Sequence, residues 1–267
     1  MKVGLAGFGA IGQRVAVEVA RMVPELCLAA ITSGDLERAR VRAQALLQVA
    51  PPVVPLSELV VRSDLVVEAA PAAAFQEIAT ATLRAGKRLL AVSVGALLDR
   101  YSEYAHLAHR CGGRIYIPSG AIGGLDALAA AAVGQVETVT MVTRKPPRAL
   151  AGAPYLEKHG IDVMALREPQ VVFEGTAREA CRGFPANVNV SAAVSLAGIG
   201  PDRTRVRIIA DPGIDRNVHD VEVTGDFGRF AVHIENAPSE NPRTGVLAAQ
   251  SVIAMLRTLV SPVRVGT

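Results

Sequence analysis

A glycine-rich turn near the N-terminus has the residue types and spacing of a dinucleotide site. Gly7-Phe8-Gly9-Ala10-Ile11-Gly12 follows a short apolar segment and opens a stretch of helical character. In a G-x-G-x-x-G turn the first glycine permits a tight bend. The second lets a pyrophosphate approach the backbone, and the third lets helix and strand pack closely. Because the N–H groups at the start of the helix attract the pyrophosphate, we predict a dinucleotide site that includes Gly7, Gly9, Ala10, Ile11 and Gly12.

The residues that would select between NAD and NADP favour neither. An acidic residue about 20 positions beyond the motif normally binds the ribose hydroxyls of NAD. That place holds Thr32-Ser33-Gly34, with Asp35 slightly late, and Arg38 or Arg40 is available to pair with a 2′-phosphate. We therefore expect either cofactor to be usable.

His219 is the candidate acid–base group. It alternates with Val221 and Val223 along a predicted strand, so it shares their apolar face. An imidazole titrates near neutral pH and suits proton transfer. The alternative is a core histidine that is hydrogen-bonded to backbone, and the sequence leaves both open. His233 points away from that apolar set and is expected to be solvated. His106 and His109 share a helix face without a further ligand, so no metal site is predicted.

Three segments offer groups for a small anionic substrate or for the cofactor. Lys145 ends a predicted strand beside a loop stiffened by Pro146 and Pro147, where it could neutralise a carboxylate or act as a base. The alternative is a solvated strand end. Ser119 and Gly120 follow the last predicted parallel strand, where such sheets bind ligands, although a plain junction loop is the competing interpretation. Asn187 and Asn189 lie at the start of a predicted helix, where an amide side chain could bind the carboxamide of nicotinamide or a substrate carboxylate. For Asn187 the alternative is a helix cap.

The elements that would position these groups form two patterns. Over residues 1–119 short apolar segments alternate with helical stretches, which predicts a doubly wound parallel sheet of the α/β Rossmann type. Residues 120–242 predict an α+β domain with a mainly antiparallel sheet. Its strands are expected at 136–143, 206–210, 217–223 and 230–234, with a Pro- and Gly-rich loop at 146–154 and a helix at 186–196. A final helix, 243–260, is expected to pack back on the first domain.

Composition excludes several classes of protein. The chain has 267 residues, half of them hydrophobic, and a net charge of +3 with scattered basic residues, so neither disorder nor nucleic-acid binding is expected. No apolar run reaches the ~18 residues that indicate a membrane span. Cys27, Cys111 and Cys181 cannot all pair and share no metal-like spacing. We expect a cytoplasmic enzyme without a metal.

Several blocks, in order along the chain, resemble the L-aspartate dehydrogenase family. They are Gly7 to Gly12, Ser119-Gly-Ala-Ile-Gly-Gly-Leu-Asp126, Arg144-Lys-Pro-Pro147, Phe184-Pro-Ala-Asn-Val-Asn-Val190, Ile209-Ala-Asp-Pro212, Asn217-Val-His219, and Glu235-Asn236 with Asn241-Pro242. The glycine motif is common to many dehydrogenases, whereas the later blocks are more specific. The resemblance covers the whole chain.

The resemblance implies NAD(P)-dependent oxidative deamination of L-aspartate to iminoaspartate, which yields oxaloacetate and ammonia or feeds NAD biosynthesis. By motif it implies His219 as the active-site residue and places Ala121 and Asn187 in the cofactor site. It also implies a homodimer built through the second-domain sheet. Ser119, Gly120, Lys145 and Asn189 are our candidates for binding the substrate.

Two alternatives remain at the level of sequence. A reductase of the dihydrodipicolinate type shares this domain order but would need a basic cluster beside its histidine, and the nearest candidate is Arg216 alone. A redox sensor that binds dinucleotide without turnover would not need His219 in a cleft. NADH binding without turnover would favour the sensor.

Overall fold

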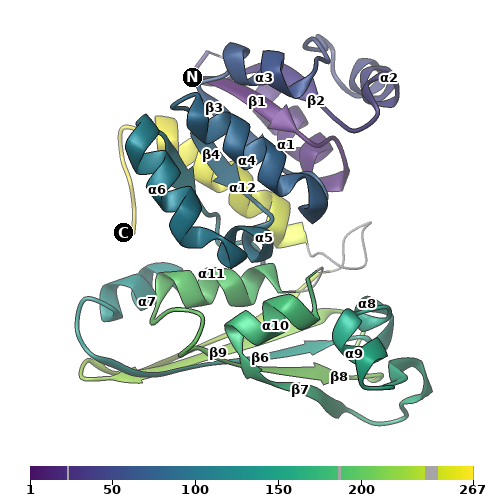
Figure 1. Ribbon diagram of the computed structural model, residues 1–267, viewed down its shortest axis with the longest axis vertical. Helices are drawn as coiled ribbons and strands as arrows, with labels where there is room; N and C mark the ends of the chain where they lie inside the picture. The colour runs from purple at the N-terminus through teal and green to yellow at the C-terminus, as the bar shows by residue number, and fades with distance from the viewer. Residues whose placement is uncertain (23, 186–187, 238–245, 267) are drawn as a thin grey trace. The chain divides into compact units, whose positions relative to one another are not determined.

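The computed structural model describes the whole chain except residues 23, 186–187, 238–245 and 267. It consists of two compact units, each described by itself below (Figure 1). Unit 1 contains residues 1–118 and 249–263. Unit 2 contains residues 119–248 and 264–267.

Unit 1 is built on a five-stranded parallel sheet with the order β2-β1-β3-β4-β5. Its strands are β1 (Lys2–Ala6), β2 (Cys27–Thr32), β3 (Leu65–Glu68), β4 (Arg88–Ala91) and β5 (Arg114–Tyr116). Its helices are α1 (Ala10–Ala20), α2 (Leu36–Leu46), α3 (Leu56–Arg62), α4 (Phe75–Arg84), α5 (Val94–Asp99), α6 (Tyr101–Cys111) and most of α12 (Val246–Val260), with a 3₁₀ turn at Ala72–Ala74. The helices that connect successive parallel strands give the predicted Rossmann arrangement.

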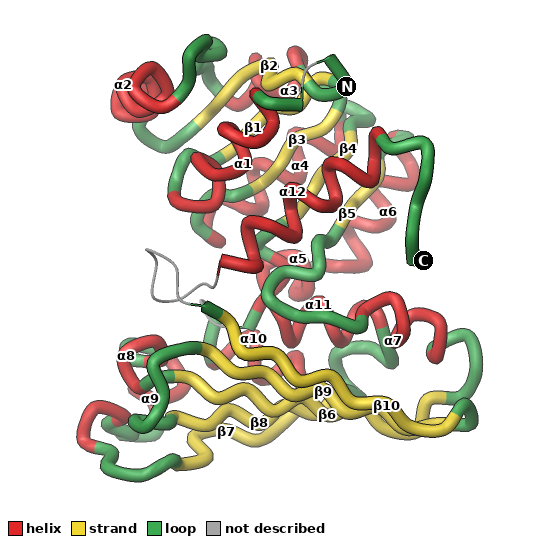
Figure 2. Tube along the Cα trace, turned by 180° about the vertical axis from the view of Figure 1, so that it is seen from behind, coloured by secondary structure: helices red, strands yellow, loops and turns green. Residues whose placement is uncertain are grey.

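Alternation along the strands sends side chains to two layers of helices. Val3 and Leu5 of β1 point to one core together with Val15 and Val19 of α1. Leu256 of α12 belongs to the same core, which explains why the last helix crosses the strands of unit 1 in Figure 2. Burial of each such aliphatic side chain contributes about 1.5–3 kcal/mol.

Unit 2 contains a second five-stranded sheet with the order β10-β9-β6-β8-β7. Its strands are β6 (Val136–Lys145), β7 (Gln170–Thr176), β8 (Arg205–Ala210), β9 (Asn217–Gly225) and β10 (Gly228–Asn236). Its helices are α7 (Leu125–Ala131), α8 (Pro147–Leu150), α9 (Pro154–Lys158), α10 (Ala177–Gly183) and α11 (Asn189–Ala197), with a 3₁₀ turn at Val163–Ala165. In Figure 1 the helices α7, α10 and α11 lie on one side of this sheet.

The predicted fold class is confirmed, with local differences. The second sheet is mainly antiparallel, but β6 and β8 pair in parallel. Strand β7 was not predicted, because a register shift between Val171 and Phe173 breaks the alternation of apolar residues. The segment predicted as a loop contains α8 and α9, each opened by a proline at its first position. Helix α11 begins at Asn189, three residues later than predicted.

Candidate functional site

The glycine turn has the backbone geometry that its spacing predicts. Gly7 has a φ of 103°, and a Cβ atom there would lie 2.4 Å from the carbonyl oxygen of Ala69. A Cβ at Gly12 would lie 2.2 Å from the carbonyl oxygen of Gly7, so both positions require glycine. A Cβ at Gly9 would meet nothing within 4 Å. That open space lies at the N-cap of α1, where a pyrophosphate would approach the backbone.

The other cofactor-binding candidates in unit 1 lie in the first turn of the same helix. Ala10 and Ile11 are its first two residues, and no acidic side chain occupies this turn. The helix also has no side-chain cap, so its first N–H groups are available to an anion. The residues present fit a dinucleotide.

The end of β2 contains no carboxylate aimed at a ribose. Thr32 is buried and ends the strand. Asp35 caps helix α2, where its Oδ1 accepts a hydrogen bond from the N–H of Arg38 at 2.9 Å. Because that carboxylate is committed to the helix, nothing on this segment resembles the acidic residue typical of NAD-specific sites.

Glu68 at the end of β3 is a buried residue that the sequence analysis missed. Its carboxylate accepts hydrogen bonds from the N–H groups of Ala70, Val92 and Ser93 and from the hydroxyl of Ser93, at 2.9–3.2 Å. Burial raises the pKa of the Glu68 carboxyl, and these hydrogen bonds oppose that rise. The group therefore ties the carboxyl end of β3 to the segment after β4. A lone acid in the apolar strand Leu65–Glu68 was the available signal.

His219 is buried in unit 2, with 1% of its surface exposed. It lies on β9 opposite Thr143 of β6, and its Nδ1 is 2.8 Å from the Thr143 hydroxyl oxygen. Burial, together with the positive charge of Lys145, lowers the pKa of His219 to about 3. The imidazole is therefore neutral near pH 7, and Thr143 fixes the orientation of its ring.

Lys145 is also buried, with 3% of its surface exposed, so its interpretation as a solvated strand end is wrong. It lies two residues beyond Thr143 on the same face of β6 and acts on the titration of His219. Burial lowers the pKa of Lys145 to about 8. The structure thus places a lysine and a histidine together on one face of the sheet in unit 2.

Arg216, which the sequence offered as the nearest basic neighbour of His219, lies elsewhere. Its side chain is exposed and pairs with Asp215 at 2.7 Å. The basic neighbour is Lys145, so the absence of a basic group near the histidine no longer argues against a reductase.

The loop that follows unit 1 approaches the same sheet of unit 2. Gly120 has a φ of 67°, and Ser119, Gly120 and Ala121 are half-buried. The Asn236 side chain of β10 donates a hydrogen bond to the Ala121 carbonyl at 3.0 Å. This contact holds the loop against the β9–β10 edge of the sheet.

Of the two asparagine candidates, the structure describes only Asn189. Asn187 lies outside the described residues. Asn189 is the first residue of α11 and is half-buried, whereas the N-cap position belongs to Val188. The helix-cap alternative proposed for Asn187 thus has no counterpart at Asn189.

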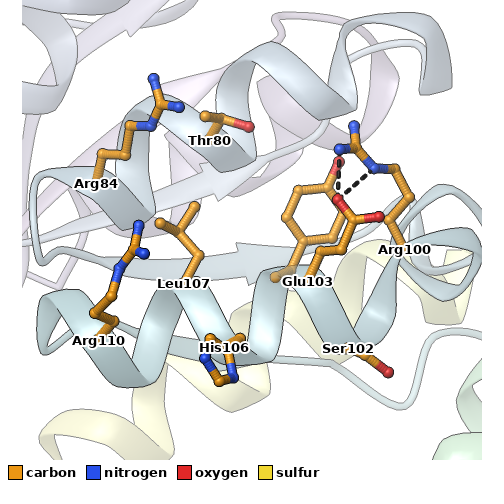
Figure 3. Close-up of a pocket in the computed structure, with 9 residues that line it drawn as sticks. Thr80, Arg84, Arg100, Ser102, Glu103, His106, Leu107 and Arg110 are labelled. Carbon is orange, nitrogen blue, oxygen red and sulfur yellow. Dashed lines mark hydrogen bonds and ion pairs between the residues drawn. The ribbon is translucent and has the colours of Figure 1, made fainter.

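Unit 1 also has a surface depression lined by residues of α4 and α6. It has a volume of about 470 Å³ and lies between α4 and α6. Figure 3 shows Arg84 and Arg110 at one end and the Arg100–Glu103 ion pair at the other. It contains none of the predicted site residues.

No group of three or more His, Cys, Asp or Glu side chains is arranged to hold a metal ion among the described residues. No helix within those residues is long and apolar enough to cross a membrane.

Comparison with known proteins matches both parts of the chain to named families. Residues 126–259 match "Aspartate dehydrogenase, C-terminal", and residues 7–118 match "Homoserine dehydrogenase, NAD binding domain". L-aspartate dehydrogenase 3 of Bordetella bronchiseptica is 48% identical, over 99% of this chain and 97% of the relative. L-aspartate dehydrogenase of Methanosarcina mazei is 42% identical, over the full length of both.

The solved structures agree. Aspartate dehydrogenase from Thermotoga maritima has a TM-score of 0.71 and 27% identity, covering 100% of this chain and 99% of that one. A homoserine dehydrogenase from Thiobacillus denitrificans has a TM-score of 0.61, covering 97% of this chain and 73% of that one, at 16% identity. The second likeness shows the fold alone.

Proposed function

Because the chain belongs to the aspartate dehydrogenase family, we propose that it oxidatively deaminates L-aspartate to iminoaspartate with NAD or NADP. Iminoaspartate then hydrolyses to oxaloacetate and ammonia. The observation that carries the proposal is the buried pair Lys145 and His219 in unit 2. A base and a cation held away from water are what an anionic amino-acid substrate needs.

The cofactor is a nicotinamide dinucleotide held at the glycine turn. Gly9 leaves open space for the pyrophosphate, and the uncapped N-terminus of α1 offers N–H groups. When bound, the nicotinamide ring accepts the hydride from Cα of the substrate. Asp35 is engaged as a helix cap, so a 2′-phosphate meets no acid on that segment. Both NAD and NADP are therefore substrates in this proposal, and Ala121 and Asn187 complete the cofactor site.

His219 accepts the proton of the substrate amine. Hydride leaves Cα only when the nitrogen lone pair is free to form the C=N bond, so the amine must be neutral. When Nδ1–H donates to the Thr143 hydroxyl, Nε2 of the imidazole is free to take that proton. The alternative role for the same nitrogen, if the amine loses its proton elsewhere, is to activate the water that attacks the imine.

Lys145 neutralises a substrate carboxylate. In the free protein its pKa is lowered to about 8 and that of His219 to about 3, and no acidic group is among the causes. A bound dianion raises the pKa of both groups, because an opposite charge favours their protonated forms. Binding of aspartate thus makes His219 a stronger base. Ser119, Gly120 and Asn189 supply the remaining polar contacts.

The chain acts as a cytoplasmic homodimer assembled through the sheet of unit 2, and iminoaspartate also serves NAD biosynthesis. The side of this sheet that α7, α10 and α11 leave uncovered in Figure 1 is available for the assembly. The cysteine pattern, which lacks a disulfide framework, supports the location. Light scattering on a sizing column tests the dimer, and a monomer at micromolar concentration would contradict it.

The test is formation of NAD(P)H, followed by absorbance, with L-aspartate and either NAD or NADP. D-aspartate, L-glutamate and L-malate serve as comparison substrates, and His219→Ala as the inactive variant. The proposal predicts turnover that requires L-aspartate and that falls about 1,000-fold or more in His219→Ala. General acid–base catalysis typically contributes roughly 10²–10⁴-fold, so the loss of the base accounts for a fall of this size. NADH binding without turnover of any amino acid would favour the sensor or the reductase.

A further inference from the structure

Two buried asparagines on neighbouring strands each have a carbonyl oxygen without a partner. Asn217 of β9 is directly opposite Asn236 of β10. They are 8% and 3% exposed, and among the described residues neither Oδ1 atom has a hydrogen-bond partner. An unsatisfied buried acceptor costs about 1–3 kcal/mol, so this pair needs donors from outside the described residues, supplied by a ligand or by ordered water.

The two amides belong to the sheet face that holds the proposed active site. Asn217 is two residues from His219 on β9, which places their Cα atoms roughly 6–7 Å apart on the same face. The Nδ2 group of Asn236 donates to the Ala121 carbonyl at 3.0 Å. That bond uses the amide nitrogen and leaves Oδ1 as the free end.

We infer that Asn217 and Asn236 bind the nitrogen of the substrate, a subsite that rests on the proposed function. Two carbonyl oxygens repel carboxylates and accept from N–H donors. After His219 has taken a proton from the amine, Cα loses a hydride with both electrons to the nicotinamide, the C–N bond becomes C=N, and the nitrogen becomes positive as an iminium with two N–H bonds. The two Oδ1 atoms match the two N–H bonds of that planar cation.

This arrangement stabilises the transition state more than the ground state. The positive charge develops on the nitrogen as hydride leaves, and fixed carbonyl dipoles next to it stabilise that charge without reorganising. A hydroxy acid offers a single O–H donor and leaves one oxygen unpaired, so the pair also selects amino acids over hydroxy acids. Lys145 holds a carboxylate, and the asparagines hold the nitrogen.

The test uses Asn217→Leu, which removes the amide at similar size, and Glu157→Gln, at an exposed position of α9, as the control. In Asn217→Leu we expect kcat for L-aspartate to fall about 10- to 100-fold and KM to rise by a smaller factor, about 3- to 10-fold, while Asn236→Leu gives a similar loss. The melting temperature should not fall, because the substitution removes an unsatisfied polar group. A kcat within twofold of the unsubstituted protein would overturn the inference.

A binding measurement separates this inference from the proposed function. With NADH present, L-aspartate should raise the melting temperature more than succinate does, and this difference should vanish in Asn217→Leu but persist in Glu157→Gln. Equal shifts for the two dicarboxylates in the unsubstituted protein would overturn the subsite. A normal difference without any turnover would instead remove the proposed function and leave the subsite standing. If Asn217→Leu loses NADH affinity tenfold and regains kcat at saturating cofactor, the oxygens serve the nicotinamide carboxamide, and the inference is wrong.

Discussion

Replacing Lys145 with methionine should make the free protein more stable and the enzyme worse. The ammonium is buried, and burial lowers its pKa from 10.5 to about 8. At about 1.4 kcal/mol per unit, the buried charge costs the folded state about 3 kcal/mol near pH 7. Methionine has similar length and no charge, so Lys145→Met should recover most of this free energy.

The gain should depend on pH in a defined direction. The pKa of Lys145 is lower in the folded than in the unfolded protein. The free-energy cost of burying its charge is therefore fully present below pH 8 and disappears as the pH rises toward 10.5. The stability difference between Lys145→Met and the unsubstituted protein should therefore shrink from about 3 kcal/mol at pH 7 to about 2 at pH 9 and well under 1 at pH 10.5.

Thermal unfolding without substrate measures the effect. About 2–4 °C per kcal/mol predicts a rise in melting temperature of up to roughly 10 °C at pH 7. Lys158→Met, at an exposed lysine on α9, is the matched control and should change little. In Lys145→Met the KM for L-aspartate should rise about 10- to 100-fold, because the substrate carboxylate loses its charged partner. A Lys145→Met protein that is no more stable at pH 7, or equally more stable at pH 10.5, would refute the reasoning.

Three further predictions concern other parts of the site. Thr143→Val should keep the fold but lower kcat about 10-fold with little change in KM, because His219 loses the partner that orients its ring. Thr143→Ser retains the hydroxyl and should keep most of the rate in the same kinetic assay. Gly9→Val should weaken NADH binding about 10-fold or more in a fluorescence titration without lowering the melting temperature. Gly12→Val should instead unfold at a lower temperature, because its Cβ would lie 2.2 Å from a backbone oxygen. Equal effects of the two variants would contradict the assignment of Gly9 to the cofactor and of Gly12 to helix–strand packing. Glu68→Ala should destabilise the protein by about 2–4 kcal/mol in chemical denaturation, because four donors lose their acceptor, and an unchanged midpoint would refute this role.

The fold of the first unit could be predicted well because its signals are local. The glycine turn, the apolar strands and the helices between them are short-range patterns, and right-handed crossovers leave few ways to assemble them. In the second unit the prediction was less complete. A bulge concealed β7, and the parallel pairing of β6 with β8 has no signature in either strand.

The sequence by itself determined the family and the dinucleotide turn, and it singled out His219 as a candidate, since each depends on residue type and spacing within short segments. The tertiary structure decided which groups surround that histidine. Thr143 and His219 are 76 positions apart, and Lys145 reaches the same face only through the register of β6 with β9. The pairing of Asn217 with Asn236 likewise follows from the β9–β10 register. Register fixes which side chains meet, and burial then shifts their titration; neither is a property of any single segment.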